Sequence, residues 1–245
     1  LHTKITWKGW LPVIESRLDY GQGNNIYKLN NQVQDPRTVM PGVIFTNSIS
    51  LPLSFSAGRF SQYLWSSLQT TYRNNYIYLR ESGLYDYGQT QLTARLFISN
   101  QHRSAFRDIY PRWGQVLDLS STFFPADKAI YGSLTTVRTA FYFPGFLRNH
   151  GIRLRFEADR QEPEKLLLFN KASFPRGYEE IISLDLRFVS ADYVMPLFYP
   201  DLNIPGLLYV KRLRAGLFYD YAEGTDNTYY KLNQFRDYTE SFRSF

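Results

Sequence analysis

The sequence alternates between apolar and polar residues over unusually long stretches. In residues 43–55 the odd positions are apolar except for Asn47, whereas serine and threonine dominate the even positions. Residues 91–99 and 151–160 repeat this period-two pattern. Because successive side chains of a β-strand point to opposite sides of the sheet, each stretch predicts a strand whose two faces meet different environments.

The same pattern, followed along the chain, predicts about nine strands. Several exceed the usual strand length of about 5–6 residues. Helical periodicity, internal repeats and linkers are not evident, so we expect one all-β domain over residues 1–245. The chain starts at Leu1 without a methionine or leader, and we expect it to be the C-terminal part of a longer protein. The predicted strands are 12–20, 43–55, 60–79, 91–99, 112–124, 130–143, 151–160, 184–198 and 209–222.

Composition excludes several classes of protein. Without cysteine, the chain cannot form disulfides or cysteine zinc sites. The sequence contains no run of about 18 apolar residues, so no transmembrane helix is expected. The net charge of +6 is mild and no dense basic block occurs, which argues against nucleic-acid binding. We also expect no cofactor.

Two architectures produce long alternating strands. A soluble sandwich or barrel buries its apolar face, whereas an antiparallel transmembrane β-barrel turns that face to lipid and its polar face to a hydrated lumen. The polar positions of 151–160 carry charges of both signs, and aromatic residues follow aliphatic ones in 209–221. Both features favour the membrane barrel, because they suit a lumen wall and an interfacial aromatic belt.

The membrane barrel predicts where particular side chains point. The residues expected to face lipid are Leu92, Leu96, Ile152, Leu154, Leu213 and Leu217. The charges expected to face the lumen are Arg153, Arg155, Glu157, Asp159, Arg212 and Arg214.

The stretch Arg176-Gly177-Tyr178 precedes the predicted strand 184–198. Asp220 lies on the predicted lumen face of 209–222, so an inward-folded loop would allow a charge-assisted bond between Arg176 and Asp220. Gly177 would permit the tight turn, and Tyr178 would wedge the loop tip against the inner wall.

These residues resemble the Omp85 superfamily, also called the bacterial surface antigen family. The tip motif Arg-Gly-aromatic is followed by Asp192-Tyr193-x-x-Pro196 and then by Phe218-x-Asp220, in the family's order over residues 172–224. Ala222 stands where the family's strand motif has glycine, and Asp192 stands where glutamate is usual. The wider sequence is similar to large envelope proteins of Bacteroidetes.

The resemblance implies an outer-membrane barrel of about sixteen strands in a Gram-negative bacterium, of which this chain would be an incomplete part. It implies a lumen loop in which Arg176 contacts Asp220 near Phe218. Its implied functions are outer-membrane protein insertion, polypeptide translocation and envelope biogenesis. The implied partners are outer-membrane lipids, client outer-membrane proteins, and lipoproteins or periplasmic domains.

Other functions remain open from the sequence. A passive porin, or a barrel that anchors a periplasmic domain, would share the strand pattern, and a soluble β-sandwich binding module is a further alternative. We expect no enzyme, because no Gly-x-Ser-x-Gly motif occurs. We expect no metal site either, because His2, His102 and His150 stand at unrelated spacings.

Overall fold

The protein is built from β-strands. The computed structural model describes residues 1–9, 11–23, 41–79, 84–104, 108–126, 131–162, 168–180, 182–204, 206, 208–227 and 237–244. Among these residues there is no helix long and apolar enough to cross a membrane. The strands are β1 (His2–Trp7), β2 (Val13–Gly23), β3 (Pro41–Ala57), β4 (Phe60–Leu79), β5 (Leu84–His102), β6 (Gly114–Phe123), β7 (Ser133–Pro144), β8 (Gly151–Glu162), β9 (Asp185–Phe198), β10 (Leu202–Ile204), β11 (Leu208–Val210), β12 (Leu213–Asn227) and β13 (Asp237–Ser244).

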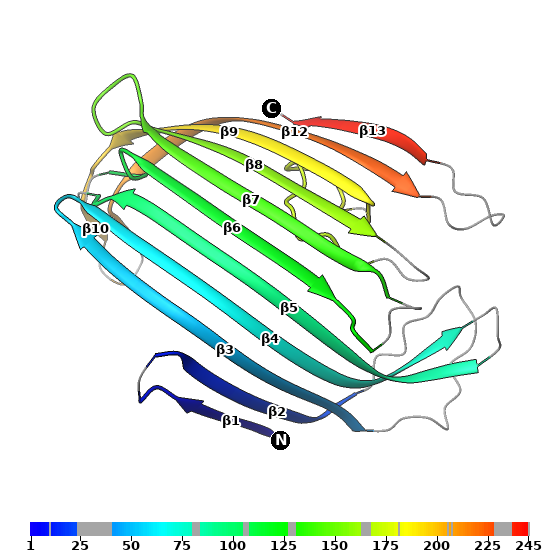
Figure 1. Ribbon diagram of the computed structural model, residues 1–245. Helices are drawn as coiled ribbons and strands as arrows, with labels where there is room; N and C mark the ends of the chain where they lie inside the picture. The colour runs from blue at the N-terminus through cyan, green and yellow to red at the C-terminus, as the bar shows by residue number, and fades with distance from the viewer. Residues whose placement is uncertain are drawn as a thin grey trace.

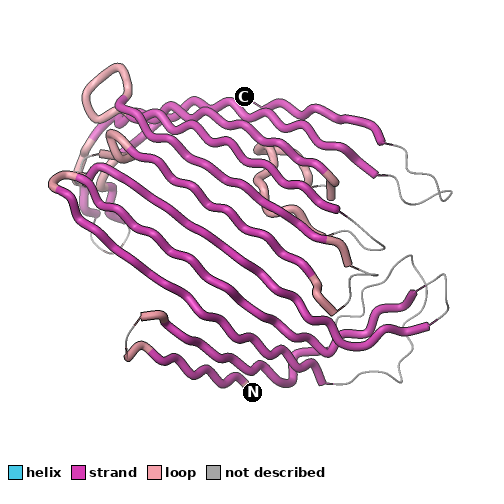
Figure 2. The backbone as a smooth tube through the Cα atoms, viewed as in Figure 1, coloured by secondary structure: helices cyan, strands magenta, loops and turns pink. Residues whose placement is uncertain are grey.

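One large antiparallel sheet contains eleven of these strands, in the order β1-β2-β3-β4-β5-β6-β7-β8-β9-β12-β13. Strands that follow one another in the sequence are neighbours in the sheet, except that the small hairpin β10–β11 is inserted between β9 and β12 (Figure 1). The sheet is curved, and neighbouring strands run alongside one another over most of their length (Figure 2). Within the described residues β1 and β13 are its two edges, and no pairing closes it into a barrel.

The predicted all-β class is confirmed, and the nine predicted strands correspond to β2 to β9 and β12. The predicted strand 209–222 is wrong at its start, because the chain leaves β11 at Val210 and β12 begins at Leu213. The sequence pattern did not identify β1, β10, β11 or β13. The pairing of β9 with β12 is irregular between Leu213 and Arg214, opposite Pro196. Proline cannot donate a ladder hydrogen bond, which suits a position beside a bulge.

The two faces of the sheet differ in chemistry. We call the face that carries loop 168–180 the inner face, because side chains of β8 and β12 on this face bind that loop. A small apolar cluster of Leu186, Phe188 and Ala222 lies there, and Ala172 and Phe174 of the loop pack against it. This contact between the loop and strands β9 and β12 forms one part of the buried core, and Phe124, Tyr131 and Leu134 beside the β6–β7 connection form another.

The opposite, outer face carries most of the apolar residues. Leu217 is 69% exposed, and Leu213 is exposed at the bulged start of β12. Leu92, Leu96, Ile152 and Leu154 are half-buried on the outer face, since they alternate with inner-face residues such as Arg95 and Arg153. None of these predicted lipid-facing leucines and isoleucines belongs to the buried core.

Candidate functional site

Loop 168–180 lies between β8 and β9 in the chain and forms a tight turn at its tip. The backbone N–H of Tyr178 donates to the carbonyl of Pro175 at 3.2 Å, which closes the turn. Gly177 has φ of 90°, a left-handed conformation that glycine adopts without the steric penalty of a Cβ. The glycine of the tip is therefore required by the backbone of the turn.

Arg176 binds Asp220 of β12 through two parallel hydrogen bonds. Its Nε donates to Oδ2 at 2.6 Å, and its Nη2 donates to Oδ1 at 2.7 Å. The backbone N–H of Arg176 also donates to Oδ2, at 3.1 Å. Asp220 is completely buried, so nearly all of its hydrogen bonding comes from the protein. A bidentate charged pair fixes both the distance and the orientation of the loop tip.

A second carboxylate, on β9, completes the surroundings of Arg176. Nη2 of Arg176 lies 2.8 Å from Oδ1 of Asp192, while Arg153 of β8 donates to Oδ2 of the same carboxylate at 2.9 and 3.1 Å. Asp192 therefore bridges the loop tip to β8. Hydrogen bonding to Asp220 and Asp192 raises the pKa of Arg176 above its ordinary value, despite the opposing effect of burial, and keeps this side chain cationic.

Aromatic stacking adds a third contact at the tip. The guanidinium carbon of Arg176 lies 3.7 Å from the centre of the Phe218 ring, two residues before Asp220 on β12. A guanidinium over an aromatic face is stabilised electrostatically by the ring. Tyr178, predicted to wedge the tip, instead remains 47% exposed, and Phe218 is the ring that contacts the arginine.

The first half of the loop is bound by side chains of β8. Oδ2 of Asp159 accepts hydrogen bonds from the backbone N–H groups of Lys171 at 2.6 Å and Ala172 at 2.8 Å. Glu157 accepts from the N–H of Ser173 at 2.8 Å. Gln161 both donates to and accepts from the backbone of Leu168, at 2.7 and 2.8 Å. Three successive inner-face residues of β8 therefore bind three successive parts of the loop.

Lys171 extends the contacts of the loop across the sheet. Its Nζ donates to Oγ1 of Thr122 on β6 at 2.8 Å. Burial lowers the pKa of Lys171, and the neighbouring Arg138 and Arg95 add to this effect against the attraction of Asp159. Asp118 balances these arginines, because Arg95 and Arg138 both donate to its carboxylate, at 2.7 and 2.6 Å.

The structure distributes the predicted lumen charges unequally. Arg153, Arg155, Glu157 and Asp159 lie on the inner face, where Arg155 donates to Ser190 at 3.1 Å. Arg214 is the second residue of β12 and is exposed. Arg212 is exposed and lies in the connection before β12, so strand alternation does not assign it to either face of the sheet.

The predicted supporting motif on β9 is split between the two faces. Asp192 joins the arginine site, whereas Tyr193 points to the outer face, where its hydroxyl lies 2.6 Å from Nδ1 of His150. His102 lies beside the backbone of Arg103, and His2 beside Asp19. The part of the chain that the structure describes holds no group of three or more histidine, aspartate or glutamate residues placed to bind a metal ion.

The arrangement as a whole positions a loop. Buried carboxylates of β8 hold residues 171–173 of the loop on the inner face through backbone N–H groups, and carboxylates of β9 and β12 hold its tip through Arg176. Comparisons with protein-family models, curated proteins and solved structures found no match to this chain.

Proposed function

We propose that this chain is part of an outer-membrane β-barrel of the Omp85 type that assists the assembly of other outer-membrane proteins. The observation that carries the proposal is the bidentate contact of Arg176 with the buried Asp220, with Phe218 beneath the guanidinium. A short motif can occur by chance, but three residues matching the family's pattern also meet in space. Polypeptide translocation and envelope biogenesis are related activities that the same site would serve.

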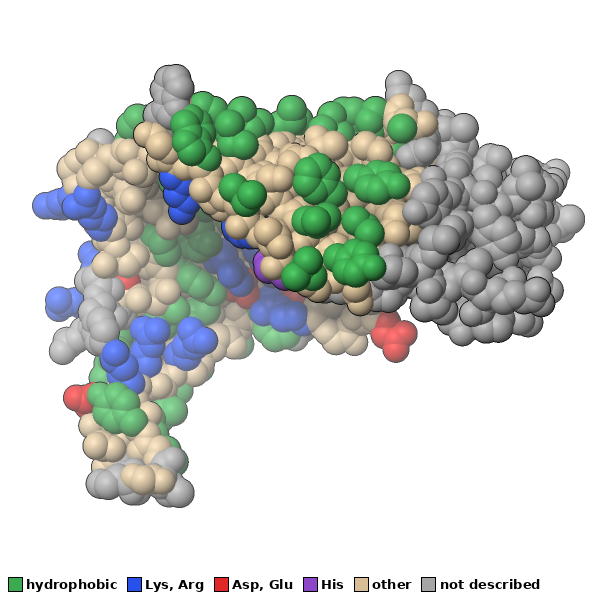
Figure 3. Space-filling view, turned by 90° about the horizontal axis from the view of Figure 1, so that it is seen from below, with side chains coloured by type: hydrophobic (Ala, Val, Ile, Leu, Met, Phe, Trp, Pro, Cys, Tyr) green, Lys and Arg blue, Asp and Glu red, His purple; other side chains and the backbone are tan. Residues whose placement is uncertain are grey.

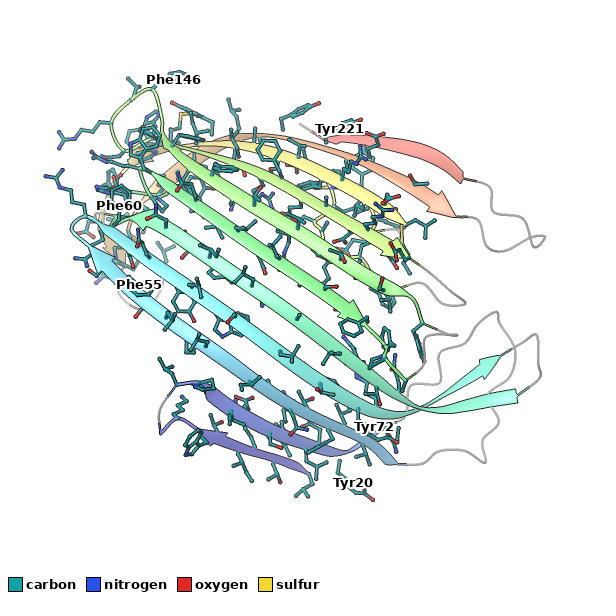
Figure 4. The ribbon with its side chains drawn as sticks, viewed as in Figure 1. Tyr20, Phe55, Phe60, Tyr72, Phe146 and Tyr221 are labelled. Atoms are coloured by element: carbon teal, nitrogen blue, oxygen red, sulfur yellow. The ribbon has the colours of Figure 1, made fainter. Side chains whose placement is uncertain are left out.

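The outer face suits contact with lipid. In Figure 4, Tyr20 and Tyr72 lie near one end of the sheet, and Phe55, Phe60 and Phe146 lie near the other. Aliphatic residues such as Ile49 and Leu68 occupy the outer face between them, where both are exposed. An aliphatic band between two aromatic belts is the pattern of a membrane barrel. A β-sandwich would need a second large sheet packed on this one, and the described residues provide only the hairpin β10–β11 beside it.

The proposed mechanism uses the edges of the sheet and no covalent chemistry. An edge strand presents unpaired N–H and C=O groups that can pair with a strand of another protein. A barrel that opens between its first and last strands would offer such an edge to a client. The anchored loop 168–180 would stabilise the wall formed by β8, β9 and β12, next to the edge strand β13, while the sheet opens at its edges.

Reconstitution of the full-length protein in phospholipid vesicles tests this proposal against a passive porin. An unfolded outer-membrane barrel protein is added, and its folding is followed by the heat-dependent change in its migration on gels. We expect faster client folding than in empty vesicles, and a smaller acceleration with Arg176→Ala. Leakage of small solutes without any acceleration would favour the porin, and a protein that does not enter vesicles would overturn the membrane assignment.

A further inference from the structure

Positive charge is concentrated at one end of the sheet. We call this the turn end; it consists of the connections 8–12, 58–59, 103–113, 145–150 and 199–212. Its described residues include seven lysines and arginines, all exposed, and two aspartates. Among the described residues, this end therefore carries an excess of five positive charges. The seven are Lys8, Arg59, Arg103, Arg112, Arg148, Lys211 and Arg212, and the aspartates are Asp108 and Asp201.

The two aspartates at the turn end already have partners. Asp108 lies 3.7 Å from Arg112, and Asp201 accepts a hydrogen bond from the hydroxyl of Tyr209. At the opposite end, loop 168–180 mixes both signs, with Arg176 followed by Glu179 and Glu180. Lysine and arginine side chains project at the left of Figure 3, the same end that holds β10 in Figure 1. Within the described residues, the turn end thus has an excess of cations, whereas loop 168–180 carries as many acidic as basic residues.

Exposed apolar side chains lie among these cations. Phe146 and Leu147 are 88% and 67% exposed, directly before Arg148 in the β7–β8 connection. The ring of Phe146 lies 5.8 Å from that of Tyr193, which belongs to the outer face. Trp113, half-exposed, meets Phe143 edge-on at 5.5 Å. At Phe146 and Trp113, the apolar outer face thus extends into the basic connections.

We infer that the turn end binds the phosphate headgroups of an anionic phospholipid leaflet, with Phe146 and Leu147 inserted at the level of the headgroups. This inference rests on the proposed membrane function. Aromatic side chains favour the membrane–water interface, and arginine and lysine beside it attract anionic lipids. An acidic protein partner would match the charge, but it would not explain why Phe146 and Leu147 continue the surface that the proposed function turns to lipid.

The absence of cysteine in the chain permits a direct test. Leu147→Cys is labelled with a fluorophore in the full-length protein and reconstituted in mixed vesicles of phosphatidylglycerol and phosphatidylcholine. A small fraction of one of the two lipids carries a nitroxide quencher. We expect quenching by labelled phosphatidylglycerol to exceed quenching by labelled phosphatidylcholine at least about two-fold at about 0.1 M salt, because the charges act over about 10 Å. At about 1 M salt the Debye length falls to about 3 Å, and the ratio should approach one.

Two variants separate charge from structure. The combination Arg59→Gln, Arg103→Gln, Arg148→Gln and Arg212→Gln should bring the quenching ratio close to one at low salt, whereas lysine at the same four positions should preserve it. A label at Leu96→Cys, in the middle of the outer face of β5, tests the membrane assignment itself. Quenching at position 96 without lipid preference at position 147 would overturn this inference alone. A label at position 96 that no lipid quenches would overturn the proposed membrane function.

Discussion

Arg176 and Asp220 are 44 residues apart in the sequence, yet the guanidinium of one donates two hydrogen bonds to the carboxylate of the other. Asp220 is buried at the inner face of β12, and Asp192 on the neighbouring strand contacts the same arginine. The guanidinium thereby ties the loop tip to two adjacent strands at once. Removing either carboxylate should loosen the tip without disrupting the ladder of backbone hydrogen bonds below it.

Asp220→Asn should destabilise the folded protein by about 2 kcal/mol, measured by denaturant unfolding in detergent. Breaking a buried ion pair costs about 3–5 kcal/mol. The lower value is expected because the side chain of Arg176 is 41% exposed and can be partly rehydrated. Arg214→Gln, an exposed change on the same strand, should alter stability by less than about 0.5 kcal/mol. Equal stability of Asp220→Asn and the wild type would exclude a structural role for the contact.

Asp159→Ala should loosen the first half of the loop selectively. Its carboxylate accepts hydrogen bonds from two loop N–H groups, at Lys171 and Ala172. Losing an acceptor of this kind lowers the local stability of the loop by about 1–1.5 kcal/mol. Backbone amide exchange in a peptide covering 168–173 should therefore become about ten-fold faster. Glu162→Ala, an exposed acid on the same strand, serves as the control. Unchanged exchange in the loop would mean that the contacts of Asp159 do not hold it.

Much of this fold could be predicted from the sequence because the two faces of the long strands have opposite compositions. Alternation identifies β3, β5 and β8, although β5 begins at Leu84, seven residues before the predicted stretch. The short edge strand β1 is exposed throughout, so burial did not shape its sequence into a recognisable pattern. The predicted strand 209–222 began too early, because the alternation continues through Lys211 and Arg212 although the chain is not extended in the sheet there.

The sequence predicted the tip of the candidate site but not the contacts that hold the rest of the loop. The contact between Arg176 and Asp220 was expected from the charges and the family motif. The roles of Glu157 and Asp159 as acceptors for the loop backbone were not, because backbone N–H groups are common to nearly all residues and give no sequence signal. Phe218 was part of the motif, but its contact with the guanidinium depends on the height of the loop above β12.

Gly224→Ala tests how closely Ser183, in the connection just before β9, packs against β12. An added Cβ would lie 2.8 Å from Oγ of Ser183 and 3.4 Å from its Cβ. This overlap should destabilise the protein by at least about 1 kcal/mol. Adding Ser183→Ala should restore most of the loss, because Oγ is buried and no hydrogen-bond partner is found for it among the described residues. Gly216→Ala on the same strand, whose nearest contact would be 3.4 Å, should be nearly neutral. Equal effects of the two alanines would contradict this packing.

Lys171→Met should leave the protein as stable as the wild type, or more stable, at neutral pH. Burial lowers the pKa of Lys171 from its ordinary value of 10.5, so the folded state releases this proton more readily than the unfolded state. Wild-type stability should therefore rise with pH between the lowered pKa and 10.5, whereas the methionine variant lacks this contribution. Unfolding measured from pH 7 to 10 should show the advantage of methionine shrinking as pH increases. An advantage that grows with pH would contradict the burial of a charged lysine.

Leu68→Arg and Gln69→Arg place the same charge on opposite faces of β4. Leu68 is exposed on the outer face, whereas Gln69 lies on the inner face, where it donates to Thr71. If the outer face meets lipid, an arginine at its centre costs about 2–4 kcal/mol, while a lumen-facing arginine is tolerated. Leu68→Arg should therefore reduce the fraction of protein that folds into vesicles, and Gln69→Arg should not. Because the two positions are adjacent, they share the same strand and depth, and only the direction of the side chain differs. The reverse order of effects would place water on the outer face and an apolar environment on the inner one.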